Sequence, residues 1–280
     1  MTNKYFEQLN KQKKLIEKMG HKVAYICIYG SQNYGMDVKT DDYESDLDMK
    51  AIIVPTLDNL IFNSKPISTT IDTEWGQCDL KDIREWTDNV CKGNPTYIES
   101  LFTDYYIIDE EFQENFQKIL DKRDDLVYTL REQIARASYG MMCQKYSALE
   151  HPYPTIMHKI EKWGYDGKQS HHVLRLLLLI NDFLFENIPY KECLSKHAFD
   201  NGQQTVWGEF LKGFKYNEYS LGIARKLTKE YLDRGQILKD KVIERMKDVK
   251  VDYTPKNDII NLGRYIIKES IENNILIDFR

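Results

Sequence analysis

Apolar and polar positions follow two different patterns along this chain. Over the first hundred residues, short apolar runs alternate with polar turns, which predicts strands and short helices. From about residue 111, apolar residues recur at spacings of three and four, which is typical of amphipathic helices. The change predicts an α+β protein with an N-terminal mixed domain over residues 1–110 and an all-helical domain over residues 111–280.

The N-terminal part is expected to place strands between helices. Runs rich in β-branched and aromatic residues predict the strands, and Pro55 ends one of them. The segment 37–45 is polar and predicts a loop. The expected elements are helix 5–19, strand 23–29, a short helix 31–36, strand 46–54, strands 67–72 and 76–81, helix 82–91, and a helix from Pro95 to Leu101.

The C-terminal part reads as a series of helices separated by proline and glycine. These residues interrupt helices, so they set the expected boundaries. The expected helices span 111–122, 127–149, 168–187, 201–213, 217–248 and 257–273.

Charge is distributed unevenly over the two parts. Residues 1–110 contain 12 Lys and Arg against 19 Asp and Glu, a net charge of −7. Residues 111–280 contain 27 against 25, a net charge of +2. Because the second part has no strong basic excess, a large nucleic-acid interface is not expected.

Membrane, secretory and disulfide signals are missing from the sequence. No apolar run is long enough to span a bilayer, and residues 1–20 lack the apolar core of a secretory signal. The five Cys are scattered, odd in number and without a CxxC pair. We therefore expect a cytoplasmic protein with reduced thiols, no membrane partner and no zinc site.

The candidate chemistry lies at the ends of two predicted strands. Strand 23–29 leads into Gly30-Ser31, and strand 46–54 opens with Asp46 and Asp48. Side chains at i and i+2 leave a strand on the same face, so these two carboxylates repel unless hard cations such as Mg²⁺ bind there. A Gly-Ser turn that opens a helix offers N–H groups and a hydroxyl to phosphates. Together they predict a site for a nucleoside triphosphate and its metal ions.

A third carboxylate is expected from Asp79, on the predicted strand 76–81. Two metal ions that clamp an in-line phosphoryl transfer need such a partner, which could also accept the proton of the attacking hydroxyl. As structural alternatives, Asp46 and Asp48 belong to an acidic loop, and Asp79 caps the next helix. The joint pattern favours the metal site over these alternatives.

Several short motifs in the chain carry a resemblance to a known family. They are Tyr29 to Gly35 (YGSQNYG), Ser45 to Asp48 (SDLD), Asp79-Leu80-Lys81, Gly93-Asn94-Pro95, Gly164 to Lys168 (GYDGK) and His172 to Leu176 (HVLRL). They resemble the polymerase-beta-like nucleotidyltransferase superfamily and, more narrowly, uncharacterised nucleotidyltransferases of bacteria and phages. The resemblance covers most of residues 23–180. The loop between Gly35 and Ser45 is longer than the usual spacing of the superfamily.

The resemblance implies a mixed sheet with flanking helices and two Mg²⁺ ions, with Mn²⁺ as an alternative. It implies transfer of a nucleoside monophosphate from an NTP, such as ATP, with release of pyrophosphate. By position, Asp46 and Asp48 become the metal pair, Asp79 the third carboxylate, and Gly30 and Ser31 the residues that hold the β- and γ-phosphates. The acceptor hydroxyl is left open between an RNA or tRNA 3′ end, a protein side chain and a small molecule.

A row of basic side chains is expected on the predicted helix 168–187. Lys168, His172 and Arg175 are spaced i, i+4 and i+7, so they share one face among apolar neighbours. Cations beside a triphosphate can neutralise the leaving pyrophosphate. The structural alternative is a solvated helix edge with His172 hydrogen-bonded in the core. With the resemblance we favour phosphate contact, and Lys145 on the preceding predicted helix is a further candidate.

Two functions of different classes remain open at this point. Intact carboxylates and an intact Gly-Ser turn favour a nucleotidyltransferase. The alternative is a catalytically silent nucleotide-binding module, or an antitoxin-like module that binds a protein partner. Tyr34, next to the turn, is expected either to stack on a ribose or base or to pack on the first helix.

Overall fold

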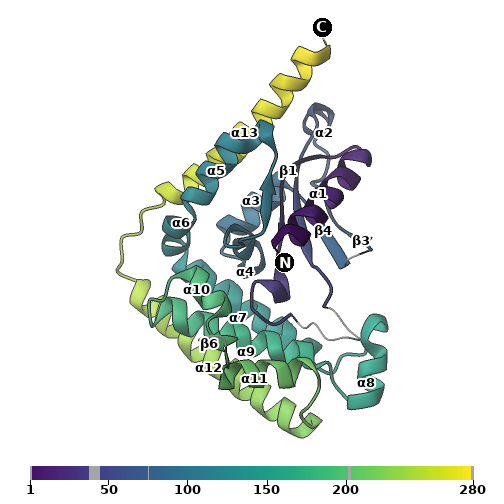
Figure 1. Ribbon diagram of the computed structural model, residues 1–280. Helices are drawn as coiled ribbons and strands as arrows, with labels where there is room; N and C mark the ends of the chain where they lie inside the picture. Colours follow the sequence, from purple (N-terminus) through teal and green to yellow (C-terminus); the bar gives the residue numbers. More distant parts are fainter. Residues whose placement is uncertain (1, 38–44, 75, 201–202, 279–280) are drawn as a thin grey trace. The chain divides into compact units, whose positions relative to one another are not determined.

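The computed structural model describes residues 2–37, 45–74, 76–200 and 203–278. A mixed sheet lies in the N-terminal half, and helices make up most of the rest (Figure 1). This confirms the predicted α+β class. The strands are β1 Lys22–Ile28, β2 Met49–Val54, β3 Ser68–Thr73, β4 Gly76–Asp82, β5 Tyr106–Ile108, β6 Phe199–Asp200 and β7 Gln203–Gln204.

Most predicted helices are present with shifted ends. The helices are α1 Thr2–Lys18, α2 Leu57–Ile61, α3 Ile83–Cys91, α4 Pro95–Ile98, α5 Gln113–Asp121, α6 Arg123–Thr129, α7 Arg131–Ala148, α8 Met157–Trp163, α9 Gly167–Leu184, α10 Tyr190–Ser195, α11 Val206–Lys215, α12 Leu221–Met246 and α13 Thr254–Asp278. The short helices α2, α8 and α10 were not expected, and the expected helix 127–149 is divided between α6 and α7.

Local capping explains one of the larger shifts. The helix expected to begin at residue 201 begins at Val206, because the Thr205 side chain accepts a hydrogen bond from the Gly208 N–H and caps it. Residues 201 and 202 lie outside the described residues, as do residues 38–44 of the expected loop. The short helix expected over 31–36 is a single 3₁₀ turn, Gly30–Gln32.

The main sheet has five strands in the order β3-β4-β2-β1-β5. β2 and β4 run parallel, whereas the other neighbouring strands are antiparallel, so the sheet is mixed as predicted. In the parallel pair Lys50 lies beside Asp79, and in the β3–β4 pair Thr70 lies beside Asp79. This register brings polar side chains of three strands together on one face.

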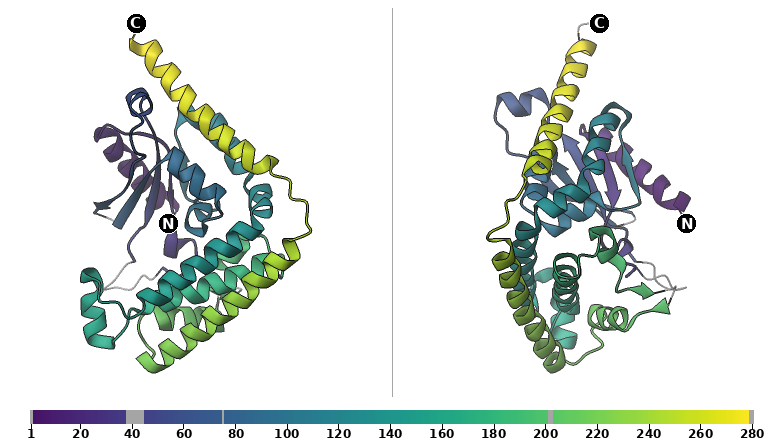
Figure 2. Two further views of the ribbon diagram at one scale, coloured as in Figure 1. Left: turned by 180° about the vertical axis from the view of Figure 1, so that it is seen from behind. Right: turned by 90° about the vertical axis from the view of Figure 1, so that its left-hand side faces the viewer.

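Apolar side chains of α1 cover one face of the sheet. Leu9 and Ile16 pack there against alternate strand residues such as Ile26, Ala51 and Leu80. The helices α3, α5 and α13 lie on the other face (Figure 2). Aromatic side chains pack on that second face, where the Tyr25 ring stacks on Phe116 and the Trp86 ring contacts Phe116 at a tilt.

The chain forms two compact units. The first spans Met1–Asn33, Asp37–Leu130 and Val251–Arg280, and the second spans Tyr34–Met36 and Arg131–Lys250. These units follow packing, whereas the predicted domains, 1–110 and 111–280, followed the change of secondary structure. The helices α5, α6 and α13 come after residue 110 and belong to the first unit.

The last helix, α13, joins the first unit through specific contacts. Ile259 and Ile266 are buried there, and Lys122 of the α5–α6 junction forms an ion pair with Asp258 at 2.8 Å. The Cys91 thiol at the end of α3 donates a hydrogen bond to the Lys256 carbonyl. Because α13 is long and directly follows α12, the longest described helix, sequence periodicity alone assigns it to the helical part.

Helix α9 is the centre of the second unit. It packs against α7, α11 and α12, and most of its side chains are buried. No helix within the described ranges is both long and apolar enough to cross a membrane. At its first residue, Gly167, a Cβ atom would lie 1.9 Å from the Phe214 carbonyl oxygen of α11. A glycine is therefore required for α9 and α11 to approach this closely.

Gly167→Ala is expected to destabilise the protein by about 3 kcal/mol, because the added methyl group has to push two buried helices apart. Urea unfolding followed by circular dichroism measures this loss. Gly140→Ala is the matched control in α7, where an added Cβ meets no atom within 4 Å. The control should gain about 0.8 kcal/mol from helix propensity. Equal stability of the two variants would contradict the close approach.

Candidate functional site

The turn after β1 brings Gly30 and Asp48 together. Gly30 has a φ of +81°, in the left-handed region that favours glycine. A Cβ at this position would lie 3.0 Å from the Asp48 Oδ2 atom. The Tyr29 N–H also donates a hydrogen bond to the Asp48 carbonyl at 3.0 Å. The absence of a side chain at Gly30 therefore makes room for the Asp48 carboxylate.

A buried glutamate that sequence reasoning missed holds the same turn. The Glu99 carboxylate accepts hydrogen bonds from the Gly30 N–H at 2.7 Å and from Asn33 Nδ2 at 3.2 Å. Glu99 follows α4, which begins at the Asn94 cap and Pro95. The only hint of Glu99 in the sequence was its position shortly after Asn94 and Pro95, which start the helix. Because the Gly30 N–H donates its hydrogen bond to Glu99, this N–H is not available to a phosphate in the structure.

Asp46 lies apart from this arrangement. It is exposed and precedes β2, which begins at Met49, so the expected strand 46–54 starts three residues too early. The alternation argument therefore does not place Asp46 and Asp48 on one strand face. The Asp46 carbonyl accepts a hydrogen bond from Gln32 Nε2 at 2.9 Å, which ties its backbone to the turn. Its role as a metal ligand stays a prediction.

Asp79 lies on β4 and is held by three donors from outside that strand. Its Oδ1 accepts a hydrogen bond from Thr70 Oγ1 at 2.7 Å, and its Oδ2 accepts one from the Tyr29 hydroxyl at 2.9 Å. Lys50 Nζ lies 3.3 Å from the same Oδ2. Partial burial raises the pKa of Asp79, but the Lys50 charge and these hydrogen bonds outweigh it and lower the pKa below its usual value.

The orientation of Asp79 follows from strand alternation. Its neighbours Cys78 and Leu80 point into the core beneath α1, so Asp79 points to the opposite face. Lys50 points to that face as well, since its amine reaches the Asp79 carboxylate. The predicted cap of the following helix is instead supplied by Asp82, which accepts a hydrogen bond from the Arg84 N–H.

Lys50 is the second residue of this site that sequence reasoning missed. Its side chain is 1% exposed, and its amine lies 4.2 Å from the centre of the Tyr29 ring and 5.0 Å from that of Tyr97. Burial lowers its pKa, and the Asp79 charge opposes this effect only in part. The available signal was a lysine two residues after Asp48 in an otherwise apolar strand.

The Tyr29 hydroxyl lies within the electrostatic influence of three acidic side chains. Burial raises the pKa of Tyr29 far above its usual value, and the charges of Asp79, Asp48 and Glu99 raise it further. Three carboxylates therefore act on one hydroxyl at the end of β1. At neutral pH this hydroxyl keeps its proton, which it donates to Asp79.

The carboxylates provide the oxygen donors that Mg²⁺ prefers, and the Asp48 carboxylate lies against the Gly30 turn. By this chemistry Asp48 and Asp79 fit a divalent cation. Among the residues that the structure describes, however, no three His, Cys, Asp or Glu side chains converge closely enough to hold a metal ion. The Asp79 carboxylate faces Lys50 instead, and Asp46 lies outside. A metal site therefore requires these side chains to rearrange.

The second unit gathers the predicted basic residues on two packed helices. Lys168, His172 and Arg175 lie on α9, and Lys145 lies on α7. Burial lowers the pKa of Lys145, and the charges of Lys168 and Arg175 lower it further. The charge of Asp166 opposes this effect. Basic side chains on these two packed helices can attract anions.

His172 is not part of the cationic row in this state. Burial, and after it the neighbouring charged side chains, lower the pKa of His172 well below its usual value, so the ring is neutral at pH 7. The core hydrogen bond considered for His172 is made by its neighbour, since His171 Nδ1 lies 3.0 Å from the Leu211 carbonyl. Burial lowers the pKa of His171 to about 3.

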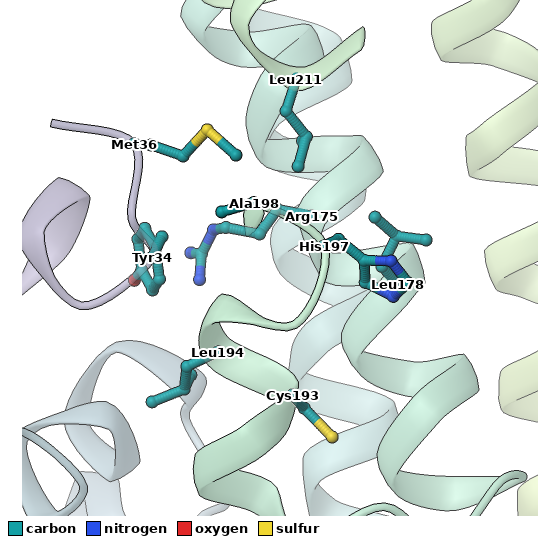
Figure 3. A pocket seen from close by; sticks show the side chains of 9 residues that line it. All are labelled: Tyr34, Met36, Arg175, Leu178, Cys193, Leu194, His197, Ala198 and Leu211. Atoms are coloured by element: carbon teal, nitrogen blue, oxygen red, sulfur yellow. The ribbon is translucent and has the colours of Figure 1, made fainter. Parts of the chain in front are cut away.

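Tyr34 packs on Arg175 within the second unit. The guanidinium carbon lies 3.8 Å from the centre of the Tyr34 ring, and the ring is buried. Figure 3 shows the two side chains facing each other at a small pocket with largely apolar walls. The pocket has room for about one water molecule. Tyr34 thus contacts a basic side chain, and stacking on a base or ribose stays a prediction.

The GYDGK motif fixes the start of α9. Asp166 caps the helix by accepting a hydrogen bond from the Lys168 N–H, and it is almost fully buried. Its carboxylate also accepts hydrogen bonds from Lys159 at 2.9 Å and Gln169 at 2.8 Å. Asp166 therefore serves to position Lys168 in the first turn of α9.

Comparisons with known proteins give a weak structural likeness and no match of other kinds. No protein-family model matches the chain. No curated protein matches it either. Among solved structures, a nucleotidyltransferase-like protein from Exiguobacterium sibiricum 255-15 is 11% identical, with a TM-score of 0.27, over 94% of this chain and 91% of its own. A TM-score of this size does not show a shared fold, so the function has to be argued from the residues.

Proposed function

We propose that the protein is a metal-dependent nucleotidyltransferase, which moves a nucleoside monophosphate from an NTP to an acceptor hydroxyl. The observation that supports this most is the Gly30 turn, which accommodates the Asp48 carboxylate. The Tyr29 hydroxyl next to this turn bonds Asp79 and is also affected by the charge of Asp48. Hard oxygen donors beside a turn without a side chain suit a triphosphate and its divalent cation.

In the proposed reaction, the acceptor oxygen attacks the α-phosphorus of the NTP. A new oxygen–phosphorus bond forms, and the bond from the α-phosphorus to the bridging oxygen of the β-phosphate breaks, so pyrophosphate leaves. Asp79, ionised at neutral pH, accepts the proton of the acceptor hydroxyl. Asp48 and Asp79, joined by Asp46 from the preceding loop, would hold the Mg²⁺ ions, which neutralise phosphate charge when bound.

Two groups of residues, one in each unit, are separate candidates for binding phosphate. In the turn, the Ser31 hydroxyl is the candidate donor, while the Gly30 N–H stays with Glu99. In the second unit, Lys145 on α7 and Lys168 and Arg175 on α9 offer positive charge. We assign this cluster to phosphate binding, because basic side chains attract the negative charge of a phosphate.

Lys168→Ala is expected to weaken NTP binding about tenfold, because a charge-assisted hydrogen bond contributes about 1.5–3 kcal/mol. Fluorescence anisotropy with a labelled ATP analogue measures the change in Kd. Lys226→Ala, an exposed position on α12, is the matched control and should bind like the wild type. Unchanged affinity in Lys168→Ala would assign the row on α9 to a structural role.

The transfer itself is tested with α-³²P-labelled NTPs, Mg²⁺ and either total RNA or cell lysate as the source of acceptors. The wild type should label one class of acceptor, and Asp48→Ala should label none. Ribonuclease and protease treatment of the product then separates an RNA or tRNA 3′ end from a protein, and a label resistant to both indicates a small molecule.

A second candidate function is a catalytically silent module that binds a nucleotide or, in the manner of an antitoxin, a protein partner. The observation that favours it is the state of the carboxylates: Asp79 is engaged by Lys50, Tyr29 and Thr70, and Asp46 is exposed. Saturable NTP binding without any labelled product in either acceptor pool would support this module and contradict transfer.

A further inference from the structure

A buried ammonium group lies beside Asp79, the carboxylate that the proposed site needs as a metal ligand. Lys50 Nζ is 3.3 Å from Asp79 Oδ2 and almost completely shielded from solvent. It lies on β2, directly beside Asp79 of β4 in the parallel register. A divalent cation bound to Asp79 would carry two further positive charges next to this amine. At such short distances in a partly buried site, like charges repel by several kcal/mol.

The surroundings of Lys50 also give the amine a second set of partners. The rings of Tyr29 and Tyr97 lie 4.2 Å and 5.0 Å from its nitrogen. Aromatic faces attract a cation through their quadrupole, most strongly when water is excluded. The ammonium group therefore remains stabilised by the two rings when its hydrogen-bond contact with Asp79 is broken.

We propose that Lys50 is a resident counter-ion of Asp79, which a divalent cation has to displace from the carboxylate when the site is loaded. This inference deepens the proposed function and rests on its assignment of Asp79 as a metal ligand. It explains why the described carboxylates do not form a group that could hold a metal ion. Asp79 is turned toward Lys50, Tyr29 and Thr70 instead. Loading then exchanges one cation for another, so the nucleotide-free protein binds metal weakly.

The test is the affinity of the full-length, nucleotide-free protein for Mn²⁺, measured as free Mn²⁺ by electron paramagnetic resonance. Lys50→Met keeps the length of the side chain and removes the charge. It should bind Mn²⁺ at least about tenfold more tightly than the wild type, since a competing and repelling cation is gone. Lys81→Met is the control on β4, two residues from Asp79, where the amine bonds Ser68 instead. The Lys81 charge acts on Asp79 less than that of Lys50 does, so any gain in affinity should stay well below that of Lys50→Met.

The double variant Lys50→Met/Asp79→Asn shows where the gain arises. If the tighter binding takes place at Asp79, adding Asp79→Asn removes it. Equal affinity in Lys50→Met and the wild type would overturn the inference while leaving the transferase proposal in place. A gain that persists in the double variant would also overturn it. Absence of Mn²⁺ binding in every form would overturn both the inference and the metal-dependent function.

A measurement on the wild type covers the case in which Lys50→Met does not fold. The ¹H–¹⁵N signal of the buried Lys50 ammonium group is followed by NMR during titration with Mg²⁺. Displacement from Asp79 predicts that this signal shifts as the metal binds, whereas the Lys81 signal does not. A Lys50 signal that stays in place at saturating Mg²⁺ would contradict the exchange. Neither measurement depends on transfer activity, so a failed transfer assay is a separate result.

Discussion

Asp48→Asn is expected to lower nucleotidyl transfer by about a thousandfold or more and to leave thermal unfolding close to that of the wild type. The amide keeps the shape of the side chain beside Gly30 but removes the negative charge that the metal ion requires. In the metal-free protein this change also relieves repulsion, since Asp48, Asp79 and Glu99 all act on the Tyr29 hydroxyl. Label transfer and differential scanning calorimetry on the same preparation measure the two effects.

Loss of transfer with unchanged stability is expected for a metal ligand, whereas loss of both is expected for a structural carboxylate. Asp46→Asn should show the first of these outcomes, because Asp46 is exposed and its backbone, not its side chain, bonds Gln32. A loss of more than about 2 kcal/mol of stability in Asp48→Asn would point to a structural carboxylate. Wild-type transfer rates in Asp48→Asn would remove Asp48 from the site.

Asp79→Asn is expected to abolish transfer as well, but also to lower the free energy of unfolding by about 3 kcal/mol. The reason is Lys50, which is 1% exposed and would be left as a buried charge without its carboxylate. Urea unfolding at pH 7 measures this loss. Lys50→Met/Asp79→Asn, which removes both charges, should recover most of the lost stability.

The same pair predicts a dependence on pH. The pKa of Asp79 is lowered in the folded protein by Lys50 and the hydrogen bonds, against the effect of burial. The pair therefore stabilises the fold above the unfolded pKa of about 3.9, and this contribution is lost as the pH falls through the lower folded value. The stability gap between wild type and Asp79→Asn should close below about pH 4. A gap that is constant from pH 7 to pH 3 would contradict an ionised Asp79.

Local patterns in the sequence were sufficient for the fold class and most elements. An apolar run predicted β1, and two short segments next to turn residues predicted β3 and β4, each within one or two residues. The start of β2 was wrong, since Asp46 to Asp48 lead into the strand without belonging to it. Backbone pairing with β1 and β4 decides that boundary, and it is a non-local property.

The residues missed at the site depend on contacts between distant parts of the chain. Lys50 looks like the one polar position of an apolar strand, and its burial depends on the register between β2 and β4. Glu99 reaches the Gly30 N–H from another element, after α4. Tyr34 meets Arg175 although the two lie far apart in the sequence. Periodicity describes one element at a time, so it predicts none of these pairs.

Spacing on a single helix was informative in the second unit, within limits. It placed Lys168, His172 and Arg175 on α9 correctly, because helical spacing is a local property. It did not predict the charge state of His172, which depends on burial and on nearby cations such as Lys145 of another helix. The cationic residues therefore come from two helices, α7 and α9, and not from a single row on α9.

The most direct test of the metal site is a crystal soaked with Mn²⁺ and a non-hydrolysable NTP, with anomalous diffraction recorded for manganese. The account predicts an anomalous peak within coordination distance of Asp48 and Asp79, beside Gly30, with Lys50 withdrawn from the Asp79 carboxylate. A bound nucleotide with manganese elsewhere, or no peak at these two carboxylates at saturating Mn²⁺, would contradict it.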